Sequence, residues 1–213
     1  KKSSKEIEVL TQKRADDFPW DSLFVCGYGA NRSIRGSKVY DEYSIADALY
    51  TLFEYNAQLQ NPELMLRRRA TSEDELQESA NWINEVLMLE EGSTKIDSRG
   101  IGIKDQMSSE ITYGSVPDGY AATITLVSDM LGWALLADKK SEKNNLYGIV
   151  IIDELEQHLH PSWQINIVRL LHSVFENIQF ICTTHSPLCA IGSANLENAE
   201  QTCSLVSLYQ DGN

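Results

Sequence analysis

The sequence is poor in cysteine and in positive charge, and it has no long hydrophobic run. Its 4 cysteines form no Cys-x-x-Cys pair, so a cysteine-bound metal is not expected, and Cys26 and Cys182 lie in apolar runs that predict reduced core residues. No apolar run approaches the roughly 18 residues of a membrane span, and the N-terminal residues contain no signal-peptide core. These absences predict a cytoplasmic protein without a membrane segment. Position 1 is not Met, which indicates a processed chain or a fragment.

Basic residues are outnumbered: 18 Lys and Arg stand against 31 Asp and Glu, and the formal net charge is −13. A surface of this charge excludes general affinity for nucleic acid, although nucleic acid held inside a larger complex remains compatible with it. Residues 67–69 (Arg-Arg-Arg) are the only dense basic cluster in the sequence. We interpret them as a solvated helix face, with a phosphate-binding patch as the alternative.

Two apolar runs that end in polar residues hold most of the functional information. Residues 149–152 (Ile-Val-Ile-Ile) lead directly into Asp153 and Glu154, and residues 180–182 (Phe-Ile-Cys) lead into residues 183–187 (Thr-Thr-His-Ser-Pro). Continuous apolar runs are typical of strands buried on both faces in parallel sheets. The carboxyl ends of such strands form the crevice where ligands bind. The two acids alone would equally suit a surface turn, but the second strand with its histidine-bearing end favours a functional site.

These residues suit phosphoryl transfer, which depends mainly on positioning and charge stabilisation. A carboxylate at a rigid strand end is a suitable Mg²⁺ ligand, and Asp153 is the candidate for it, through coordinated water. Glu154 is the candidate for polarising an attacking water, and His185 for donating to the γ-phosphate of ATP. We therefore predict an ATPase site that uses ATP and Mg²⁺.

The chain as a whole is predicted to be an α/β protein. Strand–helix alternation after residue 145 indicates an α/β sheet. Ser44 is a predicted N-cap, and Pro62 is predicted to open a helix. The predicted strands are 23–26, one or two within 99–113, 149–152, 178–184 and an edge strand at 203–209, and the predicted helices are 44–59, 63–69, 73–90, 120–137 and 162–176.

A glycine-bearing loop at residues 30–38 does not qualify as a phosphate-binding P-loop. That motif needs two glycines with four residues between them, followed by Lys and then Ser or Thr. Gly29 and Gly36 have six residues between them, and Ser37 precedes Lys38. Arg32 in this loop is nevertheless a candidate for contacting nucleotide or a neighbouring subunit.

Together the motifs resemble those of ABC-type ATPase heads in the SMC, Rad50, RecF and overcoming-lysogenization-defect branch. Residues 149–154 resemble a Walker B strand with its catalytic glutamate, residues 155–161 (Leu-Glu-Gln-His-Leu-His-Pro) the D-loop region, and residues 183–187 the histidine switch. The resemblance covers about residues 110–190 well. It implies a P-loop NTPase of the ABC head type, with a mostly parallel sheet, that forms a homodimer or higher oligomer through its heads.

The signature loop of such heads maps to residues 116–119 (Val-Pro-Asp-Gly), which makes Asp118 and Gly119 candidates for gripping the γ-phosphate bound to the opposite subunit. Gly119 and the helix start behind it favour an anion through backbone N–H groups. Pro117 departs from the family's serine and removes a hydroxyl and an N–H donor. His160 is a further candidate for nucleotide contact, and the sequence does not separate a contact with a neighbouring subunit from a helix cap.

No Walker A motif occurs in the 213 residues, although the family has one ahead of the motifs seen here. The implied domains are the end of a first ATPase lobe at 1–40, a helical insert at 41–92, and a lobe with signature, Walker B and histidine switch at 93–213. We expect the Walker A lobe to be absent from this chain, either truncated or supplied elsewhere. The chain alone is not expected to bind ATP tightly.

Residues 27–32 (Gly-Tyr-Gly-Ala-Asn-Arg) and 43–68 further resemble the Septu anti-phage ATPases, including retron-associated versions. That resemblance implies an ATP-binding and hydrolysing subunit whose ATP-dependent head dimerisation controls an HNH-type nuclease partner in bacterial antiviral defence. The alternatives are a RecF- or Rad50-like DNA-repair ATPase and an ABC-like scaffold without turnover. The acidic balance weighs against repair, and the presence of Asp153, Glu154 and His185 weighs against a scaffold.

Overall fold

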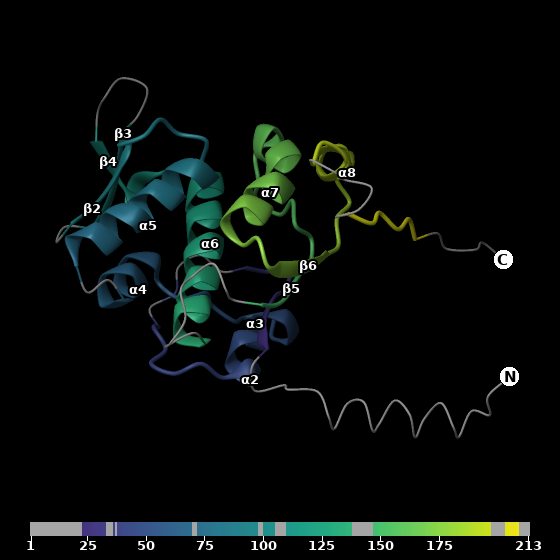
Figure 1. The fold of residues 1–213 in the computed structure, drawn as a ribbon, viewed down its shortest axis with the longest axis horizontal. Helices are drawn as coiled ribbons and strands as arrows, with labels where there is room; N and C mark the ends of the chain where they lie inside the picture. The colour runs from purple at the N-terminus through teal and green to yellow at the C-terminus, as the bar shows by residue number, and fades with distance from the viewer. Residues whose placement is uncertain are drawn as a thin grey trace, which may run out of the picture.

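The computed structural model describes residues 23–32, 36, 38–69, 72–97, 100–104, 110–137, 147–196 and 203–208. In Figure 1 the long helix α6 stands between an antiparallel sheet and a parallel one. The helices are α2 (Ile45–Ala48), α3 (Tyr50–Phe53), α4 (Pro62–Arg69), α5 (Glu73–Val86), α6 (Asp118–Ala137), α7 (Pro161–Val174) and α8 (Pro187–Ala194). Residues 139–145, whose polar composition predicts a hairpin-like connection ahead of the strand at 149–152, lie outside the described residues.

The parallel sheet has the strand order β1–β5–β6, with β1 (Phe24–Tyr28), β5 (Gly148–Ile152) and β6 (Ile178–Cys182). Val150 and Ile152 of the central strand β5 are both 0% exposed, as the apolar run predicts. Ile152 pairs with Tyr28 on one side and with Cys182 on the other, so all three strands end at the same edge. The predicted α/β fold with a parallel sheet is therefore confirmed.

The second sheet is antiparallel and has the order β2–β3–β4, with β2 (Thr94–Asp97), β3 (Gly100–Lys104) and β4 (Glu110–Thr112). β3 and β4 correspond to the strands predicted within 99–113. β2 was missed because its four residues include only one strongly apolar side chain, Ile96, and it is recognisable mainly from its packing against α5. The 3₁₀ helix η2 (Tyr113–Ser115) connects this sheet to α6.

Helix α6 is the core element that joins the two halves of the fold. Most of its side chains are buried, including Ile124, Met130 and Trp133. Its length and composition would allow it to cross a membrane, but 83% of its 18-residue apolar stretch is buried inside the fold, as in the core helix of a globular domain. Of the described helices it is the only one that meets this test of length and hydropathy.

The predicted continuous helix at 44–59 is wrong. Ser44 does cap α2, accepting a hydrogen bond from the Asp47 N–H, but the helix breaks at Leu49 and α3 ends at Phe53. The Thr51 hydroxyl donates to the Gly27 carbonyl at 2.7 Å, and these contacts with β1 set the chain direction in place of further helical turns. Tertiary contacts override local helix preference here. The helix predicted at 73–90 also ends early, at Val86.

Two predictions near the C-terminal end are also corrected. Residues 203–208 form no strand and pair with none of the strands in the described part of the chain, and Leu205, Val206 and Leu208 are exposed. Cys182 is exposed rather than buried, because it ends β6 at the margin of the described sheet. Cys26 is buried as predicted, and all four cysteines are free.

Candidate functional site

The predicted acids and histidine meet at the carboxyl edge of the parallel sheet. Asp153 and Glu154 follow β5 directly, and His185 lies in the segment after β6. The Thr183 hydroxyl donates to Asp153 Oδ1 at 2.5 Å and accepts from the Glu154 N–H at 2.9 Å. One hydroxyl therefore links both acids to the neighbouring strand. In the sequence Thr183 was only one residue of the 183–187 motif. Its spacing from Asp153 and Glu154 does not predict that its hydroxyl contacts both.

Backbone hydrogen bonds continue past the strand ends and fix the acids in place. The Asp153 N–H donates to the Tyr28 carbonyl at 2.8 Å, and the Leu155 N–H donates to the Thr183 carbonyl at 2.9 Å. Glu154 itself has a φ of 50°, in the left-handed region that non-glycine residues rarely occupy. A strained residue at the end of a central strand is typical of functional sites, where the surrounding structure holds it.

Arg32 is part of what holds this turn. Its side chain is only 5% exposed, and Nη2 donates to the carbonyls of Glu154 at 2.7 Å and Gln157 at 3.5 Å. Burial lowers the pKa of the Arg32 guanidinium, while the nearby carboxylates, Glu156 foremost, oppose that shift. Nη1 has no hydrogen-bond partner within the described ranges. The structure thus places Arg32 against the turn after β5.

Glu156 is a functional candidate that the sequence analysis did not single out. Its carboxylate accepts from the Thr184 hydroxyl at 2.6 Å and from the His185 N–H at 2.7 Å. Partial burial raises the pKa of Glu156, but the hydrogen bonds from Thr184 and His185 outweigh it and leave this pKa below its ordinary value. The signals in the sequence were its place in the D-loop resemblance at residues 155–161 and its closeness to Asp153 and Glu154, neither of which indicated a contact with His185.

A second group of candidates lies where α6 and α7 begin. A Cβ on Gly119 would lie 3.0 Å from the His158 carbonyl oxygen and 3.4 Å from Trp163, so the absence of a side chain lets α6 approach the turn after β5. Tyr120 and Trp163 stack edge to face at 4.4 Å between ring centroids. Asp118 is exposed in the first turn of α6.

His160 belongs to this second group and caps α7. Its Nδ1 accepts from the Ser162 N–H at 3.4 Å and lies 2.8 Å from the Ser162 hydroxyl. The helix-cap alternative for His160 is therefore present in the structure. Its ring remains exposed, so a contact with a second subunit is compatible with that role.

The residues at the ends of β5 and β6 have the chemistry to bind a magnesium ion together with a nucleotide. Mg²⁺ in such sites takes one or two carboxylates and completes its shell with water and phosphate oxygens. Asp153 supplies a half-buried carboxylate with a hydroxyl beside it. Within the described ranges no group of three or more His, Cys, Asp or Glu side chains could hold a metal by itself.

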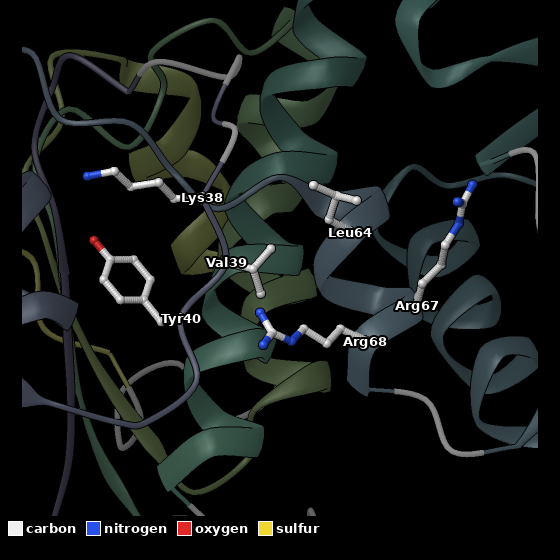
Figure 2. Close-up of a pocket in the computed structure, with 6 residues that line it drawn as sticks. All are labelled: Lys38, Val39, Tyr40, Leu64, Arg67 and Arg68. Atoms are coloured by element: carbon white, nitrogen blue, oxygen red, sulfur yellow. The ribbon is translucent and has the colours of Figure 1, made fainter.

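Arg67 and Arg68 line an open cavity of about 630 Å³ together with Lys38, Val39, Tyr40 and Leu64. Figure 2 shows the side chains of Lys38, Arg67 and Arg68 pointing in different directions, so these three cations do not converge on one anion. Arg68 forms an ion pair with Asp41, and both are largely exposed. The favoured interpretation, a solvated helix face, agrees with this geometry.

A parallel sheet whose neighbouring strands end in Asp153-Glu154 and in a histidine-bearing segment defines an α/β domain with a candidate ligand site at the carboxyl edge of its sheet. Residues 73–190 match the family described as "AAA domain, putative AbiEii toxin, Type IV TA system". The chain belongs to this AAA-domain family.

The chain is also similar to curated proteins of two related kinds. It is 47% identical over 81 residues to "Retron Vc95 probable ATPase" of Vibrio cholerae, covering 38% of this chain and 16% of that protein. It is 35% identical over 113 residues to "Septu protein PtuA" of Bacillus mycoides, covering 46% of this chain and 16% of that protein. The SMC head domain of Thermotoga maritima superposes with a TM-score of 0.40 at 17% identity, covering 60% of this chain and 43% of that one. The resemblance to Septu and retron ATPases is confirmed, and the chain spans about a sixth of the length of these curated relatives.

Proposed function

We propose that the ends of β5 and β6 form the hydrolytic part of an ATPase site. The observation that supports this most strongly is the Thr183 hydroxyl, which joins Asp153 and Glu154 at the shared edge of two parallel strands. Asp153 would hold Mg²⁺, and the ion, when bound, would neutralise charge on the transferred phosphoryl group. Its half-buried carboxylate already accepts a hydrogen bond, which fixes its orientation.

Glu154 and His185 would act on the reacting atoms. The Glu154 side chain leaves the sheet at a backbone turned by its positive φ, and there it would orient and polarise the attacking water. His185, exposed on the adjacent strand end, would donate a hydrogen bond to the γ-phosphate oxygen. The backbone N–H groups of Glu154 and His185 are held by hydrogen bonds to Thr183 and Glu156, which suits a reaction that depends on positioning.

The α6 start would act on nucleotide held by a second copy of the protein. Asp118 carries the same sign of charge as phosphate, so the grip would come from the backbone N–H groups around Gly119 and from the helix dipole. ATP would then draw two heads into a homodimer or a higher oligomer, with His160 and Arg32 at or beneath the contact. Pro117 reduces the number of donors and predicts a weaker grip than that of a serine-bearing loop.

The similarity to proteins named "Retron Vc95 probable ATPase" and "Septu protein PtuA" supports a role in anti-phage defence over one in DNA repair. In this proposal, ATP-dependent assembly in the cytoplasm controls an HNH-type nuclease partner, with nucleic acid bound in the complex rather than by this acidic chain. The domain division at 1–40, 41–92 and 93–213 remains part of the proposal.

Glu154→Gln tests the proposed function in the natural protein purified from its own host. The amide keeps the size of the side chain but removes the charge that polarises water, so we expect ATP hydrolysis to fall by about 10²-fold or more while ATP-bound assemblies accumulate. The matched control is Glu176→Gln, an exposed acid in the turn between α7 and β6. Unchanged hydrolysis in Glu154→Gln would refute the assignment and favour the scaffold.

A further inference from the structure

The segment that carries His185 has no regular secondary structure, so its conformation depends on its neighbours. Residues 183–186 connect β6 to α8 without helix or strand. The Ser186 hydroxyl donates to the side chain of Gln164 at 2.6 Å and caps α8 by accepting from the Leu188 N–H at 3.1 Å. The two ends of the segment are therefore anchored, at Thr183 to Asp153 and at Ser186 to α7.

Glu156 holds the middle of this segment. One carboxylate oxygen accepts from the His185 N–H at 2.7 Å, and the other accepts from the Thr184 hydroxyl at 2.6 Å. The Thr184 hydroxyl in turn accepts from the Ser186 N–H at 3.0 Å. Hydrogen bonds to a charged acceptor are short and stronger than neutral ones, so this carboxylate dominates the local conformation.

Glu156 itself lies in the turn after β5, and hydrogen bonds hold that turn in place. The Arg32 guanidinium donates to the carbonyl of Glu154, two residues before Glu156, and to the carbonyl of Gln157, the residue after it. The Gln157 N–H also donates to the Glu154 carbonyl at 2.9 Å. Glu156 thus projects from a turn that is held by a buried cation and by the strand β5.

We propose that Glu156 is a positioning residue for His185, joining the turn that carries Glu154 to the segment that carries the histidine. This inference rests on the proposed function. It predicts that the water-polarising acid and the γ-phosphate donor move as one unit, because the same turn carries Glu154 and holds the backbone of His185. The lowered pKa of Glu156 agrees with a carboxylate that stays ionised at neutral pH.

A double-mutant cycle with His185 tests whether Glu156 acts through the histidine. In the natural protein, Glu156→Ala removes both acceptors, and we expect kcat for ATP hydrolysis to fall by about 10-fold or more, with KM for ATP changed by less than about threefold. In a His185→Ala background the same substitution should lower kcat by less than about twofold. Equal losses in both backgrounds would overturn the proposal, because Glu156 would then act independently of His185.

Glu156→Gln is the conservative variant in this experiment. Its amide oxygen can accept from the His185 N–H while its amide nitrogen donates to the Thr184 hydroxyl, so we expect kcat within about threefold of wild type. Glu156→Gln as inactive as Glu156→Ala would contradict a positioning role that depends on these hydrogen bonds. Melting temperatures measured on the same samples show whether any loss comes from unfolding, and Glu176→Ala, an exposed acid at the opposite end of β6, should change neither kcat nor stability.

The result separates this inference from the function on which it rests. If Glu154→Gln and His185→Ala both leave hydrolysis unchanged, the proposed ATPase site is wrong and the inference falls with it. If both lower hydrolysis but Glu156→Ala adds its full effect in the His185→Ala background, the ATPase site stands and only the positioning role of Glu156 is overturned.

Discussion

The strand ends and the helix starts of this molecule are built in different ways. At the strand ends, side-chain hydrogen bonds of 2.5 to 2.9 Å join Thr183 to Asp153 and Glu154, and Glu156 to His185. At the start of α6, the main features are a close approach of Gly119 to the His158 carbonyl and an exposed Asp118. The first N–H groups of any helix have no partner within the helix. The comparison indicates that hydrogen bonds within the chain preorganise the strand ends, whereas at the start of α6 we propose contact with a second copy of the protein.

The largest predicted effect concerns Asp129, which ties α6 to the parallel sheet and so connects the two regions. Its carboxylate accepts from the Tyr28 hydroxyl at 2.9 Å and from the Gln60 N–H at 2.7 Å. Burial raises the pKa of Asp129 from 3.8 to about 6, against the smaller opposing effect of these hydrogen bonds. Because the folded pKa exceeds the unfolded one, this group stabilises the fold fully below the unfolded pKa, and the contribution is lost as pH rises through about 6.

Between pH 4 and pH 7 the wild-type free energy of unfolding should therefore fall relative to that of Asp129→Asn by on the order of 3 kcal/mol. Urea unfolding across this pH range measures the difference. The amide retains an acceptor for the Gln60 N–H and a donor for the Tyr28 oxygen, so the variant should fold. If the free energies of unfolding of the two proteins changed with pH in parallel, the pKa of Asp129 would not be raised in the folded protein.

Removal of the Thr183 hydroxyl tests the preorganised region. Thr183→Val keeps the shape of the side chain but leaves Asp153 and the Glu154 N–H without their shared partner, and we expect the apparent Mg²⁺ affinity in ATP hydrolysis to fall by about 10- to 100-fold. Magnesium titrations of the steady-state rate measure this change. Thr183→Ser, which retains the hydroxyl, should stay close to wild type; an equal loss in both variants would show that the hydrogen bonds are not responsible.

Gly119→Ala tests the proposed contact of the start of α6 with a second copy of the protein. The new Cβ would lie 3.0 Å from the His158 oxygen, so the start of α6 must shift by a few tenths of an ångström, and we expect about fivefold weaker ATP-dependent self-association. Sedimentation of the natural protein with and without ATP measures it. Gly114→Ala is the matched control, because nothing lies within 4 Å of a Cβ built there. Equal self-association of the two alanine variants would show that the start of α6 does not contact a second copy.

The smallest effect is expected outside both regions. Arg68 and Asp41 form an exposed ion pair, and such pairs contribute little to stability. Arg68→Ala should change the free energy of unfolding by less than about 0.5 kcal/mol and leave ATP hydrolysis unchanged. Thermal unfolding and steady-state assays measure both quantities, and a marked loss of hydrolysis would show that the residues 67–69 cluster belongs to the site after all.

The sequence predicted the end of β5 because its signal is local, whereas the strand predicted at 178–184 ends at Cys182 in the structure. An apolar run followed by acids specifies a buried strand and what lies at its end, and Pro62 and Ser44 mark helix starts through their own chemistry. The parallel pairing of β5 and β6 then follows from the helix between them. These elements could be predicted because each depends on a few adjacent residues.

What the sequence did not reveal depends on contacts between distant residues. The bridge from Glu156 to His185 and the position of Arg32 beneath Glu154 join segments that only the folded chain brings together. The break at Leu49 depends on β1, and the exposed course of residues 203–208 depends on the absence of a pairing strand among the described residues. Periodicity carries no information about such long-range partners.

A structure of the natural protein with Mg²⁺ and a non-hydrolysable ATP analogue would test the proposed hydrolytic site most sharply. We expect Mg²⁺ beside Asp153, the γ-phosphate between Glu154 and His185, and the start of α6 from a second copy at Gly119 on the opposite side of that phosphate. A nucleotide bound away from the ends of β5 and β6 would show that these two strands do not carry the hydrolytic site.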